Sequence, residues 1–533
     1  MTLLLALLCS LSFAQAQPAR SPFYEQAVAE SLVPIRPGTP GRAPFWNGHA
    51  RRFIYAPAFD FPQVKGAGAY RFDVETAHGK FTFEADVPWA PLTPVWKQVP
   101  AGMAKLVVVG LDRKGGKPVG ASGQRTFYRS AVFNGPYGEP VTGYQDSARR
   151  ALETIFHQPA MQSWLREGKP DPAYPLNCYP AKVMGATVLG MTLYSKLATD
   201  AGERKQALEI ARRAADFLIG LSQPANAPLA FFPPTYWDGV NPGTHPVHMD
   251  RLMMHYASDA AFGYLDLYDA TGDKKYFEAA RRIAATYRAR QQPDGTWPLV
   301  AEIATGRGIG PNLLVPTWPI TLMERLATQY GVTDYLPVAG RAFRWIEENP
   351  MRRFNWDAQF EDAKPREPYV NMSREQACDA AMYLLDHRAK DPAAVKQAEE
   401  LLRFAEDQFV VWENPGPDWK TIFRRDTSDW ITPGVLEQYT FYVPIIRSIG
   451  IMIGAWHKAY QVTGKPIYEA KARSLANAIT IAQKHWNGEY PTLLAKTESN
   501  IWLNNTVYAA KAMYEFGKPG RGENHRRGDA GVR

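Results

Sequence analysis

The chain has 533 residues, of which 45% are hydrophobic and 21% charged, and its 61 Lys and Arg residues against 53 Asp and Glu give a formal net charge of +8. These proportions are typical of a globular protein with a large core and two or three domains, and they exclude a predominantly disordered chain. The positive balance favours an acidic partner, either a polyanionic glycan or nucleic acid, without deciding between them.

The chain begins with an apolar run over residues 2–11, which is too short to span a bilayer. Ala14-Gln15-Ala16 supplies a small-x-small cleavage site, so we expect a signal peptide over residues 1–16 and a secreted or periplasmic protein. No Lys or Arg precedes the apolar run, which departs from the usual signal pattern. Beyond Cys9 only Cys178 and Cys378 remain, so disulfides are not the main scaffold, and two buried thiols or a single bridge stay open.

Short aromatic and β-branched runs follow an extended leader over residues 17–44 that is rich in Pro and Gly. The runs occupy residues 53–55, 70–74, 80–85, 105–109 and 126–128, with Gly or Pro turns between them. This spacing predicts a small antiparallel sandwich over residues 45–136 that resembles a fibronectin type III module. The Gly-rich turn at residues 112–117 is not followed by a helical pattern, so we exclude a phosphate-binding loop there.

Helical periodicity dominates residues 137–517, and an internal repeat organises it. Tyr-Asp-Ala-Thr-Gly at 268–272 leads through an amphipathic helix to an aromatic-Pro loop at 293–298, and residues 460–464 lead likewise to 487–491. Each unit predicts an inner helix that ends in Thr-Gly, a tight turn and an outer helix. The repeat places outer helices near 144–157, 202–222, 274–291, 335–348, 392–411 and 466–484, and inner helices near 178–198, 249–271, 316–330, 373–387, 434–461 and 500–516.

Six helical pairs are the number that closes a ring. An open solenoid of six hairpins is the alternative, but it would expose the apolar stripes of its end repeats, and neither end of the repeat region is polar enough to serve as a cap. We therefore predict a mainly α protein with a closed ring of six helical hairpins. The basic, Gly-rich residues 518–533 predict a disordered tail.

The loops that lead into the inner helices, here called lead-in loops, are long, so functional residues are expected on that side of the ring. Before the second inner helix they carry His248, Asp250 and Arg251, which the repeat places in the first turn of that helix. We predict His248 and Asp250 as catalytic and Arg251 as substrate-binding; the alternative is that Asp250 caps the helix and pairs with Arg251. Three histidines within eleven residues lack a metalloprotease spacing, so no metal or other cofactor is predicted.

A second polar cluster precedes and enters the fifth inner helix. It contains the predicted catalytic residues Asp429, Glu437, Tyr439 and Tyr442, together with the predicted substrate-binding residue Arg425. Glu437 has apolar neighbours and is expected one turn inside the helix, where burial would raise its pKa and suit it as a general acid. The alternative for both tyrosines is that they are core aromatics with satisfied hydroxyls.

Aromatic residues recur on the lead-in loops, and a ring of aromatic side chains around a polar pit indicates a glycan site. Sugar rings stack on aromatic faces, while Asn, Asp and Arg side chains bind hydroxyl groups. A single Trp would more often be a packing residue. The further predicted substrate-binding residues are Trp237, Trp297, Trp318, Trp356, Asp357, Arg374, Trp430, Trp502 and Asn505.

The predicted ring resembles the six-hairpin (α/α)6 toroids shared by many glycoside hydrolases, polysaccharide lyases and some sugar epimerases. The order of residues 292–298, residues 356–362, a Pro-containing stretch and a Ser-capped helix is similar to family ten pectate lyases over about a third of the ring. That family carries an acidic stretch where this chain reads Gly308 to Trp318 without a carboxylate. The resemblance therefore carries over Trp356, Asp357 and Arg374 only.

The resemblance implies a sugar substrate, and the positive charge favours β-elimination on a uronate-containing polysaccharide. The cation could come from Arg251, Arg374, Arg424 or Arg425, with His248 or the two tyrosines as base and acid. Glycoside hydrolysis by paired carboxylates, with Asp250, Asp429 and Glu437 as the candidates, is the alternative. A noncatalytic glycan-binding protein is a second alternative. Neither nucleic acid nor a membrane is expected as a partner.

Overall fold

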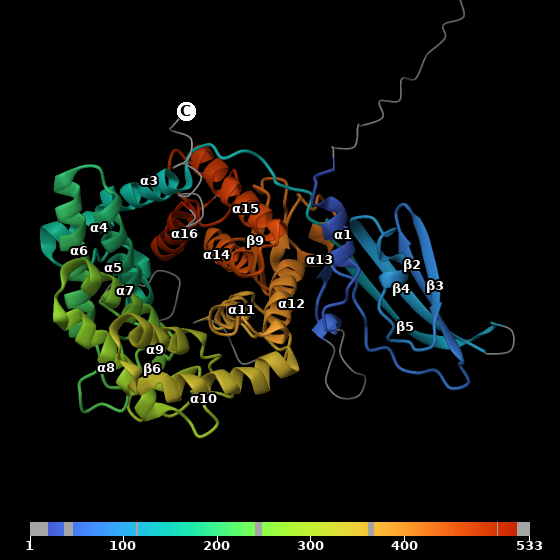
Figure 1. Cartoon of the computed structure of the whole chain (residues 1–533), viewed down its shortest axis with the longest axis horizontal. Helices are drawn as coiled ribbons and strands as arrows, with labels where there is room; N and C mark the ends of the chain where they lie inside the picture. The colour runs from blue at the N-terminus through green and yellow to red at the C-terminus, as the bar shows by residue number, and fades with distance from the viewer. Residues whose placement is uncertain are drawn as a thin grey trace, which may run out of the picture.

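The computed structural model describes residues 20–36, 46–112, 116–239, 248–360, 367–497 and 499–519. A small β-sheet lies beside a ring of paired helices (Figure 1). Within the described residues, no helix is long and apolar enough to cross a membrane. The predicted signal peptide and residues 520–533 of the predicted tail lie outside the described part of the chain.

The N-terminal sheet has five strands in the order β1-β5-β4-β2-β3: β1 (Arg52–Phe53), β2 (Ala69–Thr76), β3 (Gly79–Ala85), β4 (Gly102–Leu111) and β5 (Pro118–Arg129). Neighbouring strands are antiparallel except β1 and β5, which are parallel. Alternate side chains such as Phe72, Leu106 and Phe127 are buried on one face, where Trp96 of the short helix α2 (Thr93–Trp96) packs 5.9 Å from the Phe127 ring. The described residues of this region form a single sheet, so the predicted two-sheet sandwich is not confirmed.

The helical part is a closed (α/α)6 toroid. Along the inner ring, α5 contacts α7, and contacts then run from α7 to α9, α11, α14 and α16 and back to α5, which excludes the open solenoid. The inner helices are α5 (Pro180–Leu197), α7 (Tyr256–Thr271), α9 (Thr317–Tyr330), α11 (Glu375–His387), α14 (Ile446–Thr463) and α16 (Leu503–Phe516). The outer helices are α3 (Tyr144–His157), α6 (Ala201–Leu221), α8 (Lys274–Arg290), α10 (Leu336–Ile346), α12 (Pro392–Phe409) and α15 (Pro466–His485).

Three of the inner helices, α7, α9 and α14, end at a glycine with a positive φ value. Gly272, Gly331 and Gly464 have φ values of 70°, 72° and 67°, a left-handed conformation that glycine adopts without steric cost. Asp273 follows the first of these glycines and caps α8 by accepting from the backbone N–H of Lys275. The Thr-Gly repeat therefore marks the real turns between inner and outer helices.

Two inner helices begin later than the repeat predicts. The second begins at Tyr256 rather than 249, because Arg251–Met253 forms strand β6 against β7 (Val300–Glu302). The fifth begins at Ile446 rather than 434, because β9 (Gly434–Gln438) and β10 (Phe441–Pro444) form a hairpin that continues onto β8 (Val410–Val411). The predicted helical placement of His248, Asp250 and Arg251, and of Glu437, Tyr439 and Tyr442, is therefore wrong.

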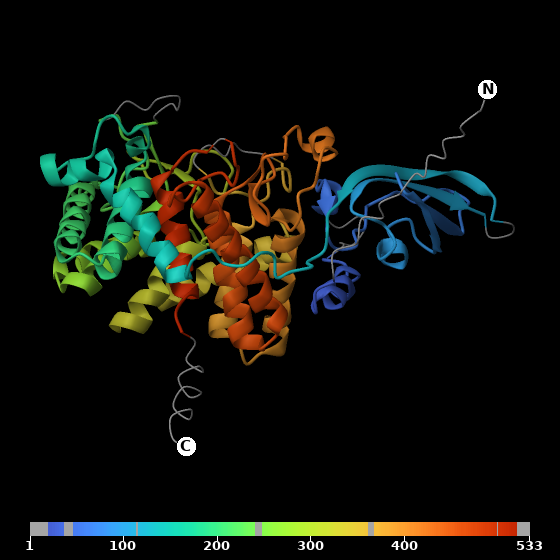
Figure 2. The same cartoon turned by 90° about the horizontal axis from the view of Figure 1, so that it is seen from above.

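The sheet lies beside the ring (Figure 2). Buried polar contacts hold the two together. The guanidinium of Arg52 donates to the carbonyl oxygens of Gln408 and Val410, at the end of α12 and in β8. The carboxylate of Asp407 accepts the backbone N–H groups of Ile54 and Tyr55. These residues are buried, and each contact has a charged side chain as one partner, which makes these hydrogen bonds stronger than neutral ones.

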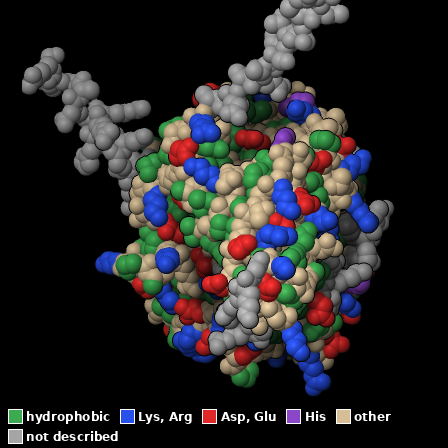
Figure 3. Space-filling view, turned by 90° about the vertical axis from the view of Figure 1, so that its right-hand side faces the viewer, with side chains coloured by type: hydrophobic (Ala, Val, Ile, Leu, Met, Phe, Trp, Pro, Cys, Tyr) green, Lys and Arg blue, Asp and Glu red, His purple; other side chains and the backbone are tan. Residues whose placement is uncertain are grey.

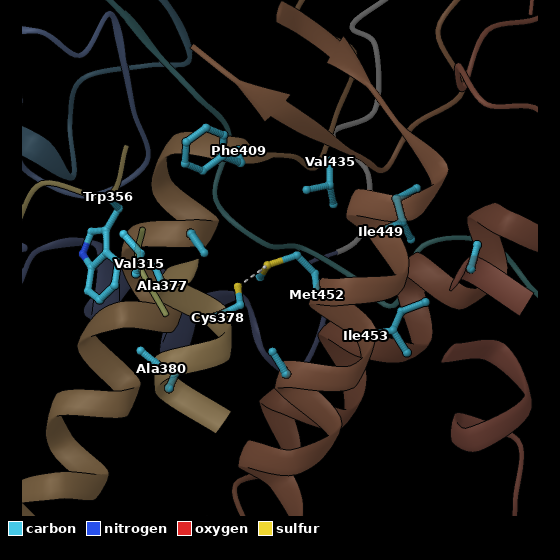
Figure 4. Packing of buried hydrophobic residues seen from close by; sticks show 14 of the residues in the cluster. Val315, Trp356, Ala377, Cys378, Ala380, Phe409, Val435, Ile449, Met452 and Ile453 are labelled. Atoms are coloured by element: carbon cyan, nitrogen blue, oxygen red, sulfur yellow. Dashed lines mark hydrogen bonds between the residues drawn. The ribbon is translucent and has the colours of Figure 1, made fainter. Parts of the chain in front are cut away.

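The core between α11 and α14 contains the Cys378 thiol, whose Sγ lies 3.5 Å from Sδ of Met452 (Figure 4). Ile449 and Ile453 of α14 pack in the same layer. Cys178 is also a buried thiol, so the single bridge that the sequence left open is not formed. Cys378 thus serves as a small packing group within the inner ring, and Cys178 lies at the end of the short helix that precedes α5.

Candidate active site

A cavity of 240 Å³, here called the mouth cavity, opens at the end of the ring where the inner helices begin. Aromatic and aliphatic side chains form much of its wall, and a carboxyl group, an ammonium group and two amides provide its polar surface. Its lining residues are Leu176, Tyr179, Lys182, Val183, Phe360, Glu437, Gln438, Phe441, Trp502 and Asn504.

Four lead-in regions bring these side chains together, and Phe360 comes from the one that precedes α11. Tyr179 immediately precedes α5, and Pro180 occupies its first position, where a missing backbone N–H costs nothing, so Lys182 lies in the first turn. Glu437 belongs to β9 of the hairpin that precedes α14. Trp502 is the residue before α16. Residues far apart in the sequence thus meet because the ring closes between α16 and α5.

Glu437 is the cavity's acidic group. Burial raises the pKa of its carboxyl, while the nearby charges of Arg374, Lys182 and Arg447 oppose that rise. Arg374 is fully buried, and its Nη1 donates to the backbone carbonyl of Glu437 at 2.8 Å and to Oγ of Ser373 at 3.1 Å. The strand is therefore held firmly, and the carboxyl is inclined toward its protonated form, as a proton donor requires.

Lys182 is the cavity's cation. Its Nζ lies 5.7 Å from the ring centroid of Tyr179 and 5.8 Å from that of Tyr256. An ammonium group near aromatic rings is attracted by their negative faces. Lys182 thus brings a positive charge to the same wall as the carboxyl of Glu437.

A charged group lies deeper along the ring axis, where Asp259, Glu375, Asp379 and Arg447 form what we call the axial cluster. These side chains line a second cavity of 310 Å³ together with aromatic residues that include Trp318. Nη2 of Arg447 donates to Oε1 of Glu375 at 2.8 Å. The guanidinium also lies 5.5 Å from the Trp318 ring centroid. Arg447 therefore stands at the centre of the cluster.

The three axial carboxyl groups differ in their pKa values. Burial alone would raise the pKa of Glu375, but Arg447 and Arg374 hold it below its usual value. Burial raises the pKa of Asp259 to about 7, and that of Asp379 also to about 7. Oδ2 of Asp379 accepts from Thr317 at 2.9 Å, whereas Oδ2 of Asp259 has no hydrogen-bond partner among the described residues. The cluster thus combines one ionised carboxylate with two carboxyls that titrate near neutrality.

We expect Asp259→Asn to change how stability depends on pH. The folded-state pKa of about 7 exceeds the unfolded value of about 3.9, so the folded protein binds the extra proton and loses stability as pH rises from about 4 to 7. Asn cannot ionise, so between pH 5 and pH 8 the variant should gain about 2 kcal/mol relative to the parent. Urea unfolding at both pH values measures this, with the exposed Asp250→Asn as control; parallel pH curves for parent and Asp259→Asn would contradict it.

Some predicted site residues line the two cavities. Glu437 and Trp502 line the mouth cavity, and Trp318 lines the second one. Arg374 touches the backbone of Glu437. Asn505 is buried, and its Oδ1 lies 3.4 Å from Nδ2 of the cavity residue Asn504.

The predicted cluster before the second inner helix lies at the rim instead. Asp250 and Arg251 form a two-pronged ion pair, with both N–O distances at 2.9 Å, and the Asp250 side chain is 63% exposed. The ring of His248 packs edge-on against Tyr236 at 5.6 Å, and Tyr236 in turn lies 5.9 Å from the cavity residue Tyr179. These residues border the mouth cavity without lining it.

The tyrosines of the second predicted cluster face the core. The hydroxyl of Tyr439 donates to Oε1 of Gln408 at 2.7 Å, and burial raises the pKa of Tyr439 well above its usual value. Tyr442 is also buried, with its ring 4.3 Å from that of Phe423. Asp429 accepts from Oγ1 of Thr497 at 2.6 Å. These contacts match the alternative that the tyrosines are core residues.

Most of the predicted tryptophans are packing residues. Trp297, Trp356 and Trp430 are buried, and Nε1 of Trp297 donates to a backbone carbonyl. Trp237 packs edge-on against an outer-helix phenylalanine. Near them, Asp357 accepts from Asn355 at 2.9 Å, and burial raises its pKa to about 6.

Lys182, Asn504 and the axial residues Asp379 and Arg447 were missed by the sequence prediction. Each lies on an inner helix that is otherwise mostly apolar, so a charged or amide side chain there is itself a signal of an axial group. Among the described residues, no group of three or more His, Cys, Asp or Glu side chains is suited to hold a metal ion.

No protein-family model and no curated protein matches the sequence. The structure is similar to cellobiose 2-epimerase from Spirochaeta thermophila (12% identity, 70% of this chain, 97% of that chain, TM-score 0.48). It is also similar to a family 76 glycoside hydrolase from a bovine Bacteroides thetaiotaomicron strain (11%, 84%, 93%, 0.46) and to unsaturated glucuronyl hydrolase from Streptococcus agalactiae (13%, 72%, 94%, 0.44). The resemblance to family ten pectate lyases is not shown. Because all three TM-scores lie below 0.5, the function has to be inferred from the residues of this chain.

Proposed function

We propose that this chain is a carbohydrate-active enzyme that cleaves glycosidic bonds of a uronate-containing polysaccharide by β-elimination in the mouth cavity. The observation that carries the proposal is the pairing of Glu437, whose carboxyl pKa is raised, with the cation Lys182 in one aromatic-walled cavity. Cleavage of a glycosidic bond needs a proton for the departing oxygen, and a uronate needs a positive charge for its carboxylate.

The lining of the cavity suits a sugar ring. Tyr179, Phe441 and Trp502 offer flat apolar faces against which the C–H groups of a pyranose can pack. Gln438 and Asn504 offer amide donors and acceptors for its hydroxyl groups. A cavity with aromatic walls and a few polar groups is the usual form of a small-ligand site.

The proposed reaction uses three side chains. Lys182 binds the uronate carboxylate and stabilises the negative charge that develops on it when the adjacent ring proton leaves. Tyr179, beside that ammonium group, is the candidate base and has to be ionised to accept the proton. The released electron pair forms the ring double bond, the bond to the departing oxygen breaks, and Glu437 protonates that oxygen. Exchange with water then returns both groups to their starting forms.

Glycoside hydrolysis remains the second candidate, because it requires the same acid. It also needs a second carboxylate across the bond. Among the described residues that line the mouth cavity, Glu437 is the one carboxyl group, and Asp259 and Glu375 lie in the deeper cavity. This arrangement favours elimination. A purely noncatalytic binding role does not require the raised pKa of the half-buried Glu437.

The deciding experiment incubates the purified chain with a panel of uronate-containing polysaccharides and follows two signals. Elimination predicts a rise in ultraviolet absorbance from the unsaturated product together with new reducing ends. Reducing ends without absorbance would replace elimination by hydrolysis. Neither signal on any polymer would overturn the proposed enzyme activity.

We expect Lys182→Met to lower kcat/KM on a uronate polymer by roughly a hundredfold, since one donor to the developing charge is lost. The loss should appear in kcat as well as KM, because the charge on the carboxylate grows in the transition state. Lys196→Met, at the exposed far end of the same helix, is the control and should leave both constants unchanged. A kcat equal to that of the parent would remove Lys182 from the reaction.

We also propose that the protein is exported, on the basis of the apolar run at residues 2–11 and the site after Ala16. Cell fractionation of a bacterium that expresses the full sequence tests this. N-terminal sequencing of the exported protein should begin at Gln17. An uncleaved protein in the cytoplasmic fraction would contradict it.

A further inference from the structure

A third concavity, with a polar lining, lies between the sheet and the short helix α13 (Trp419–Phe423), apart from the two cavities of the helical ring. It has a volume of 580 Å³, and we call it the basic groove. Its lining residues are Arg51, Met103, Lys105, Gln124, Arg125, Thr126, Thr421 and Ile422. Three cations and no carboxylate appear among them.

The cations of the basic groove have no acidic partner among the described residues. Arg51, Lys105 and Arg125 form no ion pair within 4.0 Å with a described carboxylate. Their contacts are to neutral atoms: Nη1 of Arg51 donates to the carbonyl of Ile422 at 3.3 Å, and Nη2 of Arg125 to that of Ala50 at 2.8 Å. Burial, and then the neighbouring charge of Arg51, lower the pKa of Arg125. Glu75 of β2 lies opposite Lys105 in the sheet register without forming an ion pair with it, so the positive charge that no neighbouring strand residue balances is that of Arg51 and Arg125.

Other charges of the same sheet are compensated. On β2 and β3, Asp73 accepts from Arg71 at 3.2 Å and lies 3.1 Å from Nζ of Lys80. The face of the molecule on the sheet side likewise mixes basic and acidic side chains (Figure 3). Clustered cations without partners are thus a local property of the groove, and they raise the local concentration of anions.

The walls of the groove are fixed in place. The ring of Tyr128 on β5 packs edge-on against Trp419 of α13 at 5.5 Å, and its hydroxyl donates to the carbonyl of Pro415 at 2.8 Å. The guanidinium of Arg52 lies 5.8 Å from the Trp419 ring. A ligand would therefore meet a preformed surface, which reduces the entropic cost of binding.

Residues of α13 and of the segment after it also contact residues near the mouth cavity. Phe423 at the end of α13 packs on Tyr442 of β10, and the guanidinium of Arg425 lies 5.6 Å from the ring of Phe441, which lines the mouth cavity. Lys420 and Arg424 add exposed positive charge to this segment. A chain that leaves the mouth along α13 would pass Arg425, Arg424 and Lys420 together with the exposed carboxylates of Asp426 and Asp418.

We propose that the basic groove is an accessory subsite that binds acidic groups of the polysaccharide at a distance from the bond that is cut. This inference rests on the proposed function for the nature of the polymer. Gln124, Thr126 and Thr421 supply amide and hydroxyl groups for sugar hydroxyls. Its lining contains no aromatic ring on which a nucleobase could stack, which favours an anionic glycan over single-stranded nucleic acid.

The test is affinity electrophoresis of the full chain in native gels that contain polygalacturonate, with dextran gels as the neutral reference. The double variant Arg51→Glu/Lys105→Glu should weaken the apparent affinity for polygalacturonate by about tenfold or more at low salt. The control Lys65→Glu/Lys205→Glu changes the net charge equally at exposed positions outside the groove and should bind nearly as the parent does. Arg125→Gln gives a second, smaller change within the groove.

Each outcome decides the inference. Equal retention of the groove variant and its control overturns it, as does single-stranded DNA of equal charge competing as well as the polysaccharide. Loss of retention in the groove variant alone supports it. The result is independent of catalysis, because Glu437→Gln should still be retained; a parent protein that binds through the groove but cleaves no polymer would remove the proposed function and leave the subsite.

Discussion

Glu437→Gln is expected to lower kcat on a uronate polymer by roughly 10²- to 10⁴-fold, the range that a positioned general acid contributes. The amide keeps the size and hydrogen-bonding shape of the carboxyl but cannot release a proton. Arg374 holds the strand through the backbone carbonyl of residue 437, so the variant should fold normally. Glu167→Gln, at an exposed position on the ring, is the matched control and should retain the parent activity.

The pH profile gives this prediction a second readout. Burial raises the pKa of Glu437, and the protonated form donates to the departing oxygen. The fraction of protonated Glu437 falls as pH increases through the raised pKa, so this group contributes a descending limb to the pH profile of kcat, while ionisation of the base Tyr179 contributes an ascending one. In Glu437→Gln the residual rate should lose that descending limb. If the variant keeps both the rate and the limb of the parent, Glu437 is not the acid.

The architecture of the ring could be predicted because the sequence repeat reflects the backbone conformation that is needed where an inner helix ends. Gly272 and Gly464 end helices in a left-handed conformation that other residues adopt at a cost, so a Thr-Gly pair marks the end of these two inner helices. Six such units leave no apolar end unpaired only if they close. The contacts from α16 back to α5 confirm that closure.

The starts of two inner helices could not be predicted by the same means. A run such as Val435, Leu436 and Tyr439 is apolar enough for a buried helix or for a strand, and its length does not decide between them. The structure forms the hairpin because β9 finds hydrogen-bonding partners in both β10 and β8, which is a tertiary property. Extrapolating the repeat backwards from α14 therefore extended the helix too far.

The candidate site was predictable only in part for a related reason. Glu437 was identified by its apolar neighbours, and in the structure it is half-buried among them. Trp297 and Trp356 follow the same aromatic pattern as Trp502, yet only Trp502 lines the mouth cavity. The sequence pattern shows that an aromatic side chain lies on a lead-in loop. Whether that side chain lines a cavity or is buried depends on which loops meet across the closed toroid. Lys182 is a single charged residue that belongs to no motif. It can be recognised as a cavity residue only from the contact between α5 and α16.

Arg447→Met is expected to destabilise the protein by about 3–5 kcal/mol, the range for removing one partner of a buried ion pair. Arg447 is buried, donates to Glu375 at 2.8 Å, and lowers the pKa of Glu375, Asp259 and Asp379 from the values that burial alone would impose. Met fills a similar volume, so the loss would be electrostatic. The urea midpoint of tryptophan fluorescence measures it.

The double variant Arg447→Met/Glu375→Gln tests whether Arg447 stabilises the protein through its ion pair with Glu375 or through packing. Removing both charges together removes the uncompensated carboxylate, so the double variant should recover much of the stability that Arg447→Met loses. Glu375→Gln alone should cost less than Arg447→Met, because Arg447 keeps the carboxyl of Asp259 as a neighbouring charge. Additive losses in the double variant would show that Arg447 acts through packing on Trp318 and Tyr508 instead. Because the axial cluster joins the inner helices α7, α11 and α14, recovery in the double variant would show that its charges must balance for these helices to pack around the axis.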